Sequence, residues 1–156
     1  MTSDRGSALD PYDLDRFVQA QRNVYEQALA EIRSGHKRSH WMWYIFPQYA
    51  GLGSSPMSQQ YAIKSLAEAE AYIQHPVLGT RLVECVEALL RIEDRSASEV
   101  FGASDDMKLR SSATLFAAVS PPGSVFERLL DKCFDGERDA RTVQLVAGGS
   151  QPRAEL

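Results

Sequence analysis

The segment from His36 to Ser55 concentrates the side chains best suited to chemistry, because it holds two of the three histidines, both tryptophans and a Gly-x-Gly turn. His36 and His40 stand four residues apart, as two metal ligands on one helix face would. A transition-metal site normally needs a third protein ligand, and His75 is the only other histidine. We therefore predict no metal site and no cofactor, with one of these histidines exposed and the other hydrogen-bonded near the tryptophans.

Lys37 and Arg38 come directly before a run of aromatic residues at positions 41–46. Cations beside aromatic rings can hold a nucleotide, because they bind phosphate oxygens while a ring stacks on the base. The alternative is that the rings fill the core while both cations face solvent, and this fits most of these aromatic residues better. At most one or two of the rings are expected to line a site.

The turn Gly51-Leu-Gly-Ser-Ser55 lacks the third glycine of a dinucleotide-binding fingerprint. Its backbone N–H groups could still bind an anion. An ordinary turn before the next helix is the more common outcome for such a sequence.

One predicted helix carries an unusual polar cluster. On a helix Asp105, Lys108 and Ser112 share one face, as do Lys108 and Ser111. Serine and threonine are poor residues for a helix interior, so the hydroxyls are expected to face a polar partner. Hydroxyls bonded to the preceding backbone turn are an equal alternative. If the protein is an enzyme, Asp105 or Asp106 would be the general base that acts on water.

Arg81 lies early in a predicted helix, where the helix dipole gives its positive charge no benefit. It is expected to have a specific partner, namely Glu84, Asp105 or a ligand phosphate. An internal salt bridge is the most common of these outcomes.

Covalent catalysis finds no support in the sequence, since no Gly-x-Ser-x-Gly motif occurs and neither cysteine is paired with a nearby histidine. Cys85 and Cys133 are predicted to be small buried hydrophobic residues. Burial raises the pKa of a thiol and makes it unreactive.

The elements that must position these residues are predicted to be helices, because apolar residues recur at spacings of three and four. Prolines and caps set their limits at 11–34, 65–75, 77–92, 105–119 and 125–135, with shorter helices after Ser96 and from Asp139 to Val146. The run 41–46 is either a strand or a helical turn capped by Ser39. The predicted class is all-α, a single compact domain of six or more helices around one core.

Three of these helices begin with a Ser-x-x-Glu motif, at Ser65, Ser96 and Ser124. In a capping box the serine accepts a backbone N–H of the first turn, and the glutamate reaches back to the serine N–H. All three motifs are predicted to form capping boxes.

Composition places further limits on function. The formal net charge is -4 and the pI about 5.4, which argues against a general nucleic-acid-binding protein. No signal peptide or membrane-spanning run is evident, so we expect a cytoplasmic protein. We predict a flexible N-terminal arm over residues 1–10, a helical domain over 11–146 and a flexible C-terminal tail over 147–156.

A family resemblance is visible in three groups of motifs, and it covers about residues 13–146. The chain resembles domain-of-unknown-function family 1810, a mostly bacterial family that is sometimes mislabelled calpastatin. The resemblance implies an all-helical single domain and little about activity. The motifs are Trp43-Tyr-Ile-Phe-Pro-Gln48, Gly51-Leu-Gly-Ser54 and Tyr61-Ala-Ile; Glu68-Ala-Glu-Ala-Tyr72, His75-Pro-Val-Leu-Gly79 and Arg81-Leu82; and Phe101-Gly-Ala-Ser-Asp105, Lys108-Leu-Arg-Ser-Ser112 and Thr114-Leu-Phe116.

The order of elements is also loosely similar to helical domains associated with NAD and ADP-ribose. Our leading hypothesis is a pocket for a small anionic ligand, nucleotide- or ADP-ribose-like, with Trp43 as the stacking ring because the family motif begins there. Its walls would be the segment from His40 to Ser54 and the helix beginning at Asp105. Trp43 and the segment from Asp105 to Ser112 carry unusual side chains for their local structure, so we expect them to line one cleft. If the protein is an enzyme, it would hydrolyse this ligand. The alternative is a non-catalytic helical module that binds a protein partner, and the sequence leaves the oligomeric state open. The predicted ligand-binding residues are His40, Trp43, Gln48, Ser54, Tyr61, Arg81, Lys108, Ser111 and Ser112.

Overall fold

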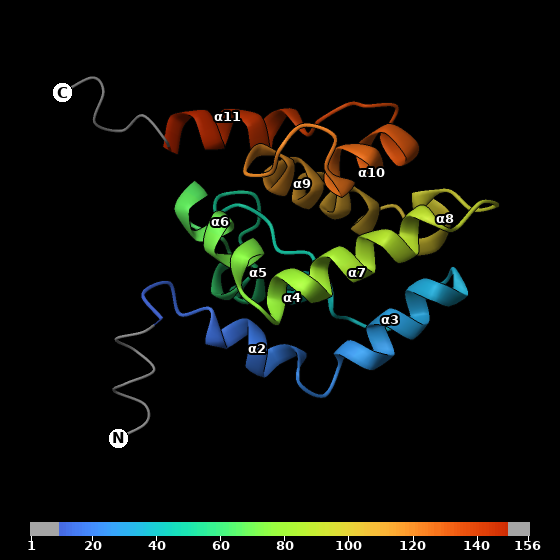
Figure 1. Cartoon of the computed structure of the whole chain (residues 1–156), viewed down its shortest axis with the longest axis horizontal. Helices are drawn as coiled ribbons and strands as arrows, with labels where there is room; N and C mark the ends of the chain where they lie inside the picture. The colour runs from blue at the N-terminus through green and yellow to red at the C-terminus, as the bar shows by residue number, and fades with distance from the viewer. Residues whose placement is uncertain (1–9, 150–156) are drawn as a thin grey trace.

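The structure is a computed structural model that describes residues 10–149, and within this range the chain forms ten helices and no strand. Figure 1 shows α7 crossing the middle of the molecule, with α2 and α3 on one side and α9 to α11 on the other. This arrangement confirms the predicted all-α single domain. The helices are α2 (Asp15–Gln21), α3 (Tyr25–Ser34), α4 (Met42–Ile45), α5 (Pro56–Gln60), α6 (Leu66–Gln74), α7 (Leu78–Leu90), α8 (Ala97–Phe101), α9 (Asp105–Ala118), α10 (Val125–Phe134) and α11 (Ala140–Gly149).

The predicted helix over 11–34 is two helices, α2 and α3, separated at residues 22–24. The first helix begins later than the predicted residue 11, with Leu14 at the N-cap position, and the Asp10 carboxylate accepts the N–H groups of Leu14 and Asp15, at 2.7 and 2.8 Å. The break lets α2 pack on α4 while α3 packs on α7. A continuous amphipathic stripe did not reveal this change of direction.

Only one of the three Ser-x-x-Glu motifs is a complete capping box, the one formed by Ser96 and Glu99. Ser65 and Ser124 accept the expected backbone N–H of the first turn. The glutamates of these two motifs instead accept the N–H of the residue before the serine. The three helices therefore start as predicted, although two of the reciprocal bonds are displaced by one residue.

The run 41–46 contains the short helix α4 rather than a strand. Ser39 does not cap it, because its hydroxyl donates to Glu31 at 2.6 Å. An isolated bridge pairs Tyr49 with Ile63, in parallel, just after this helix. The bridge joins the segment after α4 to the segment before α6.

The last helix is capped as predicted, since Asp139 accepts the backbone N–H of Thr142 at 2.9 Å. It continues through Gly149, past the predicted end at Val146. Most of the predicted N-terminal arm and of the predicted C-terminal tail lies outside the described residues.

A sharp corner between α6 and α7 is held by His75, whose Nδ1 accepts the N–H groups of Val77 and Leu78, at 3.1 and 3.2 Å. Gly79 follows immediately, and a Cβ there would lie 1.9 Å from the carbonyl oxygen of Ile73. Only glycine permits this close approach of the two backbones. The predicted helix end before Pro76 is therefore correct, and it is reinforced by contacts that the proline rule does not contain.

Most side chains of the segment 41–46 are buried in the core. Trp41 is fully buried, Phe46 is 1% exposed, and both pack against Phe101 with ring centroids 6.2 and 6.0 Å away. Trp43 and Tyr44 are the half-buried members of the run. This outcome confirms the prediction that few of these rings face outward.

Candidate functional site

A cleft beside Trp43 consists of two chambers. The larger chamber, of about 450 Å³, lies among the loop 52–55, α9 and the start of α11. The smaller chamber, of about 200 Å³, lies between the segment 48–53 and the segment 58–64. Both chambers have Trp43, Gln48, Gly53 and Ser58 in their walls, so they lie next to each other. The larger chamber is further lined by Leu52, Ser54, Ser55, Met107, Lys108, Ser111, Asp139 and Arg141, and the smaller by Tyr49, Ala50, Gly51, Gln59, Tyr61, Ala62 and Lys64.

Lys108 and Trp43, which lie far apart in the sequence, meet in this cleft. The Lys108 Nζ lies 5.4 Å from the Trp43 ring centroid, within the range of a cation–π contact. Both residues line the larger chamber. The predicted meeting of the aromatic segment with the polar face of α9 is therefore observed.

Lys108 is held by a chain of charges that leads into the protein. Its Nζ is 3.3 Å from one oxygen of Asp105, and the other oxygen is 2.9 Å from the Nζ of Lys37. The Lys37 side chain is only 6% exposed, and its Nζ also lies 4.9 Å from the Trp41 ring centroid. Two lysines thus share one carboxylate, so the group carries a net positive charge.

These two lysines determine the protonation of Asp105. Burial alone would raise the pKa of Asp105, but the hydrogen bond and charge of Lys37, and then those of Lys108, lower it below its ordinary value. A general base must present a free oxygen to water, yet both oxygens of Asp105 are paired with a lysine. This geometry favours a role for Asp105 in positioning Lys108 over a role in proton transfer.

Asp106 faces away from the cleft. One of its carboxylate oxygens accepts a short hydrogen bond from the Ser98 hydroxyl, and the other is buried without a partner among the described residues. Asp106 lines neither chamber. The two carboxylates considered as general bases therefore lie beside the cleft rather than in its wall.

The turn after Tyr49 presents unpaired backbone donors. Within the described part of the chain, the N–H groups of residues 51–55 donate no hydrogen bond. Gly51 has a φ of +102°, which favours glycine, and its carbonyl accepts a long bond from Arg141 at 3.4 Å. Gly53, Ser54 and Ser55 of this turn line the larger chamber, and the bond from Arg141 joins the turn to α11.

α11 forms one side of the larger chamber, and sequence reasoning did not identify this. The Ser111 hydroxyl lies 3.0 Å from the Thr142 hydroxyl, which in turn donates to Asp139 at 2.6 Å. These bonds fix α11 against α9 and bring Arg141 to the cleft. The only signal in the sequence was the Asp139 cap, and it gave no indication of which elements α11 would contact.

Three predicted ligand-binding residues lie outside the cleft. His40 is exposed, and its backbone carbonyl accepts a hydrogen bond from the Tyr44 hydroxyl at 3.4 Å. Ser112 is 1% exposed, and its hydroxyl has no partner among the described residues. Arg81 donates to Gln21 at 3.2 Å and stacks on Tyr25 at 4.8 Å, and within the described residues it forms no ion pair with Glu84 or Asp105, the two protein partners considered from the sequence. The structure therefore separates Arg81 from Lys108.

A buried carboxylate that the sequence did not single out organises the approach to α4. Glu31 is 7% exposed and accepts five hydrogen bonds, from the Gln27 side chain, two backbone N–H groups, the Ser39 hydroxyl and the Trp41 indole. Burial raises the pKa of Glu31, but the bonds from Ser39, the backbone and Trp41 outweigh it and lower the pKa to about 2. This network fixes the segment 36–41 and, with it, the direction of the chain into α4.

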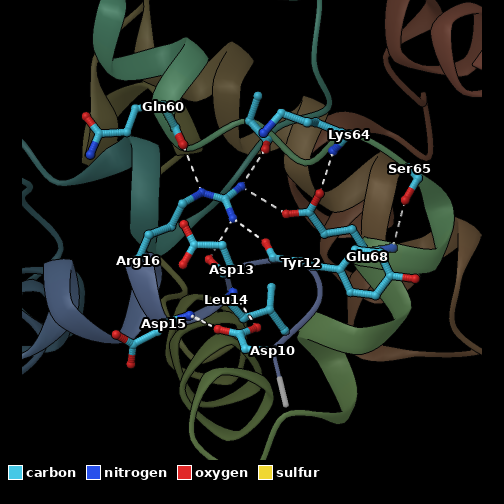
Figure 2. A network of polar contacts seen from close by, with 11 residues as sticks. Asp10, Tyr12, Asp13, Leu14, Asp15, Arg16, Gln60, Lys64, Ser65 and Glu68 are labelled. Carbon is cyan, nitrogen blue, oxygen red and sulfur yellow. Dashed lines mark hydrogen bonds and ion pairs between the residues drawn. The ribbon is translucent and has the colours of Figure 1, made fainter. Parts of the chain in front are cut away.

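A second saturated network joins α2 to the segment before α6 (Figure 2). All five N–H groups of the Arg16 guanidinium donate, four to backbone carbonyls and one to Glu68 at 2.9 Å. Glu68 is 3% exposed and also accepts the N–H of Lys64 at 2.9 Å. Because no donor of Arg16 is left for a ligand, this cluster is structural.

Metal and thiol chemistry find no suitable arrangement in the described residues. No three histidine, cysteine, aspartate or glutamate side chains gather there as a metal site would need. Cys85 and Cys133 are free thiols, and burial raises the pKa of Cys85 to about 12 and that of Cys133 above its ordinary value. Between residues 10 and 149 no helix has the length and apolar character to cross a membrane.

Comparison with known proteins places the cleft in a family context. A family model described as "Protein of unknown function (DUF1810)" matches residues 11–146. Among solved structures, the crystal structure of the conserved hypothetical protein Rv1873 from Mycobacterium tuberculosis is 51% identical in sequence, with a TM-score of 0.87. The similarity covers 88% of this chain and 99% of that chain. No match was found among curated proteins.

Proposed function

The chain belongs to the DUF1810 family of proteins of unknown function, and on that premise we propose that its cleft binds a small anionic ligand of the nucleotide or ADP-ribose class. The observation that carries the proposal is the Lys108 ammonium 5.4 Å from the centroid of the Trp43 ring, with both residues in the wall of the larger chamber. This pair combines a charge for a phosphate with an aromatic surface beside it.

The charges around the larger chamber support an anionic ligand. Lys37, Lys108 and Arg141 contribute three positive charges, and Asp105 and Asp139 contribute two negative charges, which leaves an excess of one positive charge. The chain as a whole has a formal net charge of -4. A locally positive cleft in an acidic protein attracts anions to that position rather than to the surface in general.

The backbone of the turn supports the same ligand class. The residues Gly53, Ser54 and Ser55 line the larger chamber, and their N–H groups have no acceptor within the described residues. Successive unpaired N–H groups bind anions such as phosphate. Lys108 and Arg141 stand in the wall of the same chamber, so side-chain and backbone donors can act on one phosphate group.

The proposal is for binding, with Asp105 in a positioning role. Both oxygens of Asp105 are occupied by lysines, so hydrolysis would need another group to activate water. The alternative is a module that binds a protein partner. The described surface offers it an apolar groove of about 310 Å³ on α9 and α11, whose walls include Ala118 and Val143, but no observation indicates which partner would occupy it.

The experiment is a thermal-shift screen of the purified protein against inorganic phosphate, the nucleoside monophosphates, ADP, ADP-ribose and NAD, followed by calorimetric titration of each compound that raises the melting temperature. We expect phosphate-bearing compounds to raise the melting temperature of the wild-type protein. The Lys108→Met variant should bind the same compounds more weakly. Arg128→Met is the matched control, because Arg128 is exposed on α10 and lines neither chamber. Absence of any shift across the panel would refute the proposed function.

A further inference from the structure

We infer that the two chambers receive two parts of one ligand, a flat uncharged heteroaromatic ring in the smaller chamber and a phosphate in the larger, so that the ligand is a nucleoside phosphate. This inference rests on the proposed function, and it adds where each part of the ligand lies. The sequence predicts Trp43 as the ring that stacks on the base, and the inference adds Tyr49 and Tyr61 as walls around it.

The size of the smaller chamber fits one ring system. Its volume is about 200 Å³. Complete small-molecule sites occupy roughly 300–1,000 Å³, so this chamber alone is too small for a whole nucleotide. An apolar cavity of about 150 Å³ holds benzene, so a chamber of this size accepts a planar ring.

The walls of the smaller chamber are aromatic and already fixed in position. Trp43, Tyr49 and Tyr61 all line it. The Tyr61 ring packs against Phe17 and Tyr44, with centroid distances of 5.7 and 5.3 Å. The backbone of the segment 48–50 pairs with Ile63 on both sides of the bridge, at 2.9 and 2.8 Å. Rigid aromatic walls lower the entropy cost of binding a flat ring.

The polar groups of the smaller chamber suit the edge of such a ring. The Gln48 side chain is half-buried and makes no hydrogen bond within the described residues. An amide both donates and accepts, which matches the alternating donors and acceptors of a nucleobase. Lys64, which also lines this chamber and has no ion-pair partner in the described range, can donate to a ring nitrogen or carbonyl. The chamber contains no carboxylate, so the arrangement suits a neutral ring.

The larger chamber is less suitable for the ring. The Lys108 ammonium lies over the Trp43 ring there, so a base stacked on that face would have to displace it. Phosphate has the opposite requirement, since it gains from Lys108, Arg141 and the free N–H groups of the turn. Trp43 and Gly53 line both chambers, so a ribose that connects the two parts would lie beside these residues.

The test is calorimetric titration of the full chain with ribose 5-phosphate, adenosine and the four ribonucleoside monophosphates. At least one nucleotide should bind about tenfold or more tightly than ribose 5-phosphate, the effect expected of stacking one base. The variant Ala50→Leu, which fills the smaller chamber, should remove this advantage and leave ribose 5-phosphate binding unchanged within about twofold. Lys108→Met should weaken the binding of every phosphate-bearing compound. Ala67→Leu, on an exposed position of α6, is the matched control.

The outcomes separate this inference from the proposed function. If ribose 5-phosphate binds and no nucleotide binds more tightly, the division of the cleft is wrong while anion binding stands. If Ala50→Leu weakens the binding of ribose 5-phosphate as much as the binding of the nucleotides, the division of the cleft is also wrong. If no phosphate-bearing compound binds the wild-type protein, the proposed function itself fails. Should Ala50→Leu not fold, Lys64→Met applies the same comparison, because Lys64 lines the smaller chamber and not the larger.

Discussion

The ion pair of Arg16 and the cleft around Lys108 are built from similar side chains, yet they differ in how many polar groups have a partner. Every N–H of Arg16 donates to the protein, and its carboxylate partner Glu68 is almost fully buried (Figure 2). Around Lys108, the amide of Gln48 and the N–H groups of the turn 51–55 have no acceptor in the described residues. The first region uses its polar groups to join elements, while the second leaves them available.

The difference indicates how to separate structural charge from functional charge in this fold. Saturated polar groups stabilise the folded state, and their removal leaves buried groups without partners. Unsaturated groups at a cleft contribute little to folding, because water satisfies them in the absence of a ligand. The following predictions test that distinction, in order of decreasing expected effect.

The largest effect is expected for Arg16→Met. It leaves Glu68 buried without its cation, which typically costs about 3–5 kcal/mol of unfolding free energy. Urea unfolding followed by circular dichroism measures this loss. Arg22→Met is the matched control on an exposed position at the end of α2, expected to change the stability by less than about 0.5 kcal/mol. The double variant Arg16→Met/Glu68→Leu should recover much of the loss, since it removes the unpaired charge.

If the double variant loses as much unfolding free energy as the single variant, this result would contradict the interpretation of Arg16 and Glu68 as a saturated pair. The cost would then come from the four backbone carbonyls that Arg16 also binds.

The unfolding free energy should depend on pH through the carboxylate of Glu31. Its pKa falls from 4.5 to about 2 on folding, so its contribution is fully present above pH 4.5 and is lost as the pH falls towards 2. The shift corresponds to about 3 kcal/mol. Because other carboxylates also titrate in this range, the measurement is the difference in unfolding free energy between wild type and Glu31→Gln from pH 6 to pH 2. The difference should shrink as the pH falls; a constant difference would show that the charge of Glu31 is not what stabilises the segment 36–41.

Lys108→Met should separate binding from folding. The ion pair of Lys108 with Asp105 is partly exposed and is expected to contribute less than about 1 kcal/mol to stability. Loss of the charge should weaken binding of a phosphate-bearing compound by about 1–3 kcal/mol, the usual value of a charged hydrogen bond. Calorimetric titration with a compound from the screen and urea unfolding of the same preparation give the two numbers. A variant that loses stability and keeps its affinity would assign Lys108 to the structural group.

The smallest effect on stability is expected for Gln48→Met. Its side chain has no partner to lose within the described residues, so the unfolding free energy should change by no more than about 0.5 kcal/mol. Urea unfolding measures this change. A loss of about 2 kcal/mol or more would mean that the amide has a partner within the folded protein, as a buried structural group does.

Sequence reasoning predicted the parts of this fold that depend on local rules. Caps and prolines gave the starts of α6, α8 and α10, and the corner before α7. The meeting of Trp43 with Lys108 was also predicted, because each is unusual for its local structure. Local rules could not reveal the break between α2 and α3, which follows from packing on different partners.

The residues that were misplaced or missed are governed by long-range contacts. The dipole argument indicated that Arg81 needs a partner, but it could not select Gln21 and Tyr25 from two other helices. Arg141 contacts Gly51, ninety positions earlier in the chain, and no periodicity or cap encodes that contact. Glu68 was interpreted as a capping residue because the local motif explained it, and its ion pair with Arg16 stayed hidden.

The two tryptophans give the protein a pair of built-in optical probes. Trp41 is fully buried, and its indole N–H is held by Glu31 at 2.9 Å, so its emission reports on the integrity of the core. Trp43 stands half-exposed under the Lys108 ammonium, and its emission responds to whatever displaces that cation or occupies either chamber. With Trp41→Phe and Trp43→Phe variants, a single fluorescence titration can distinguish a change in the cleft from a change in the folded state.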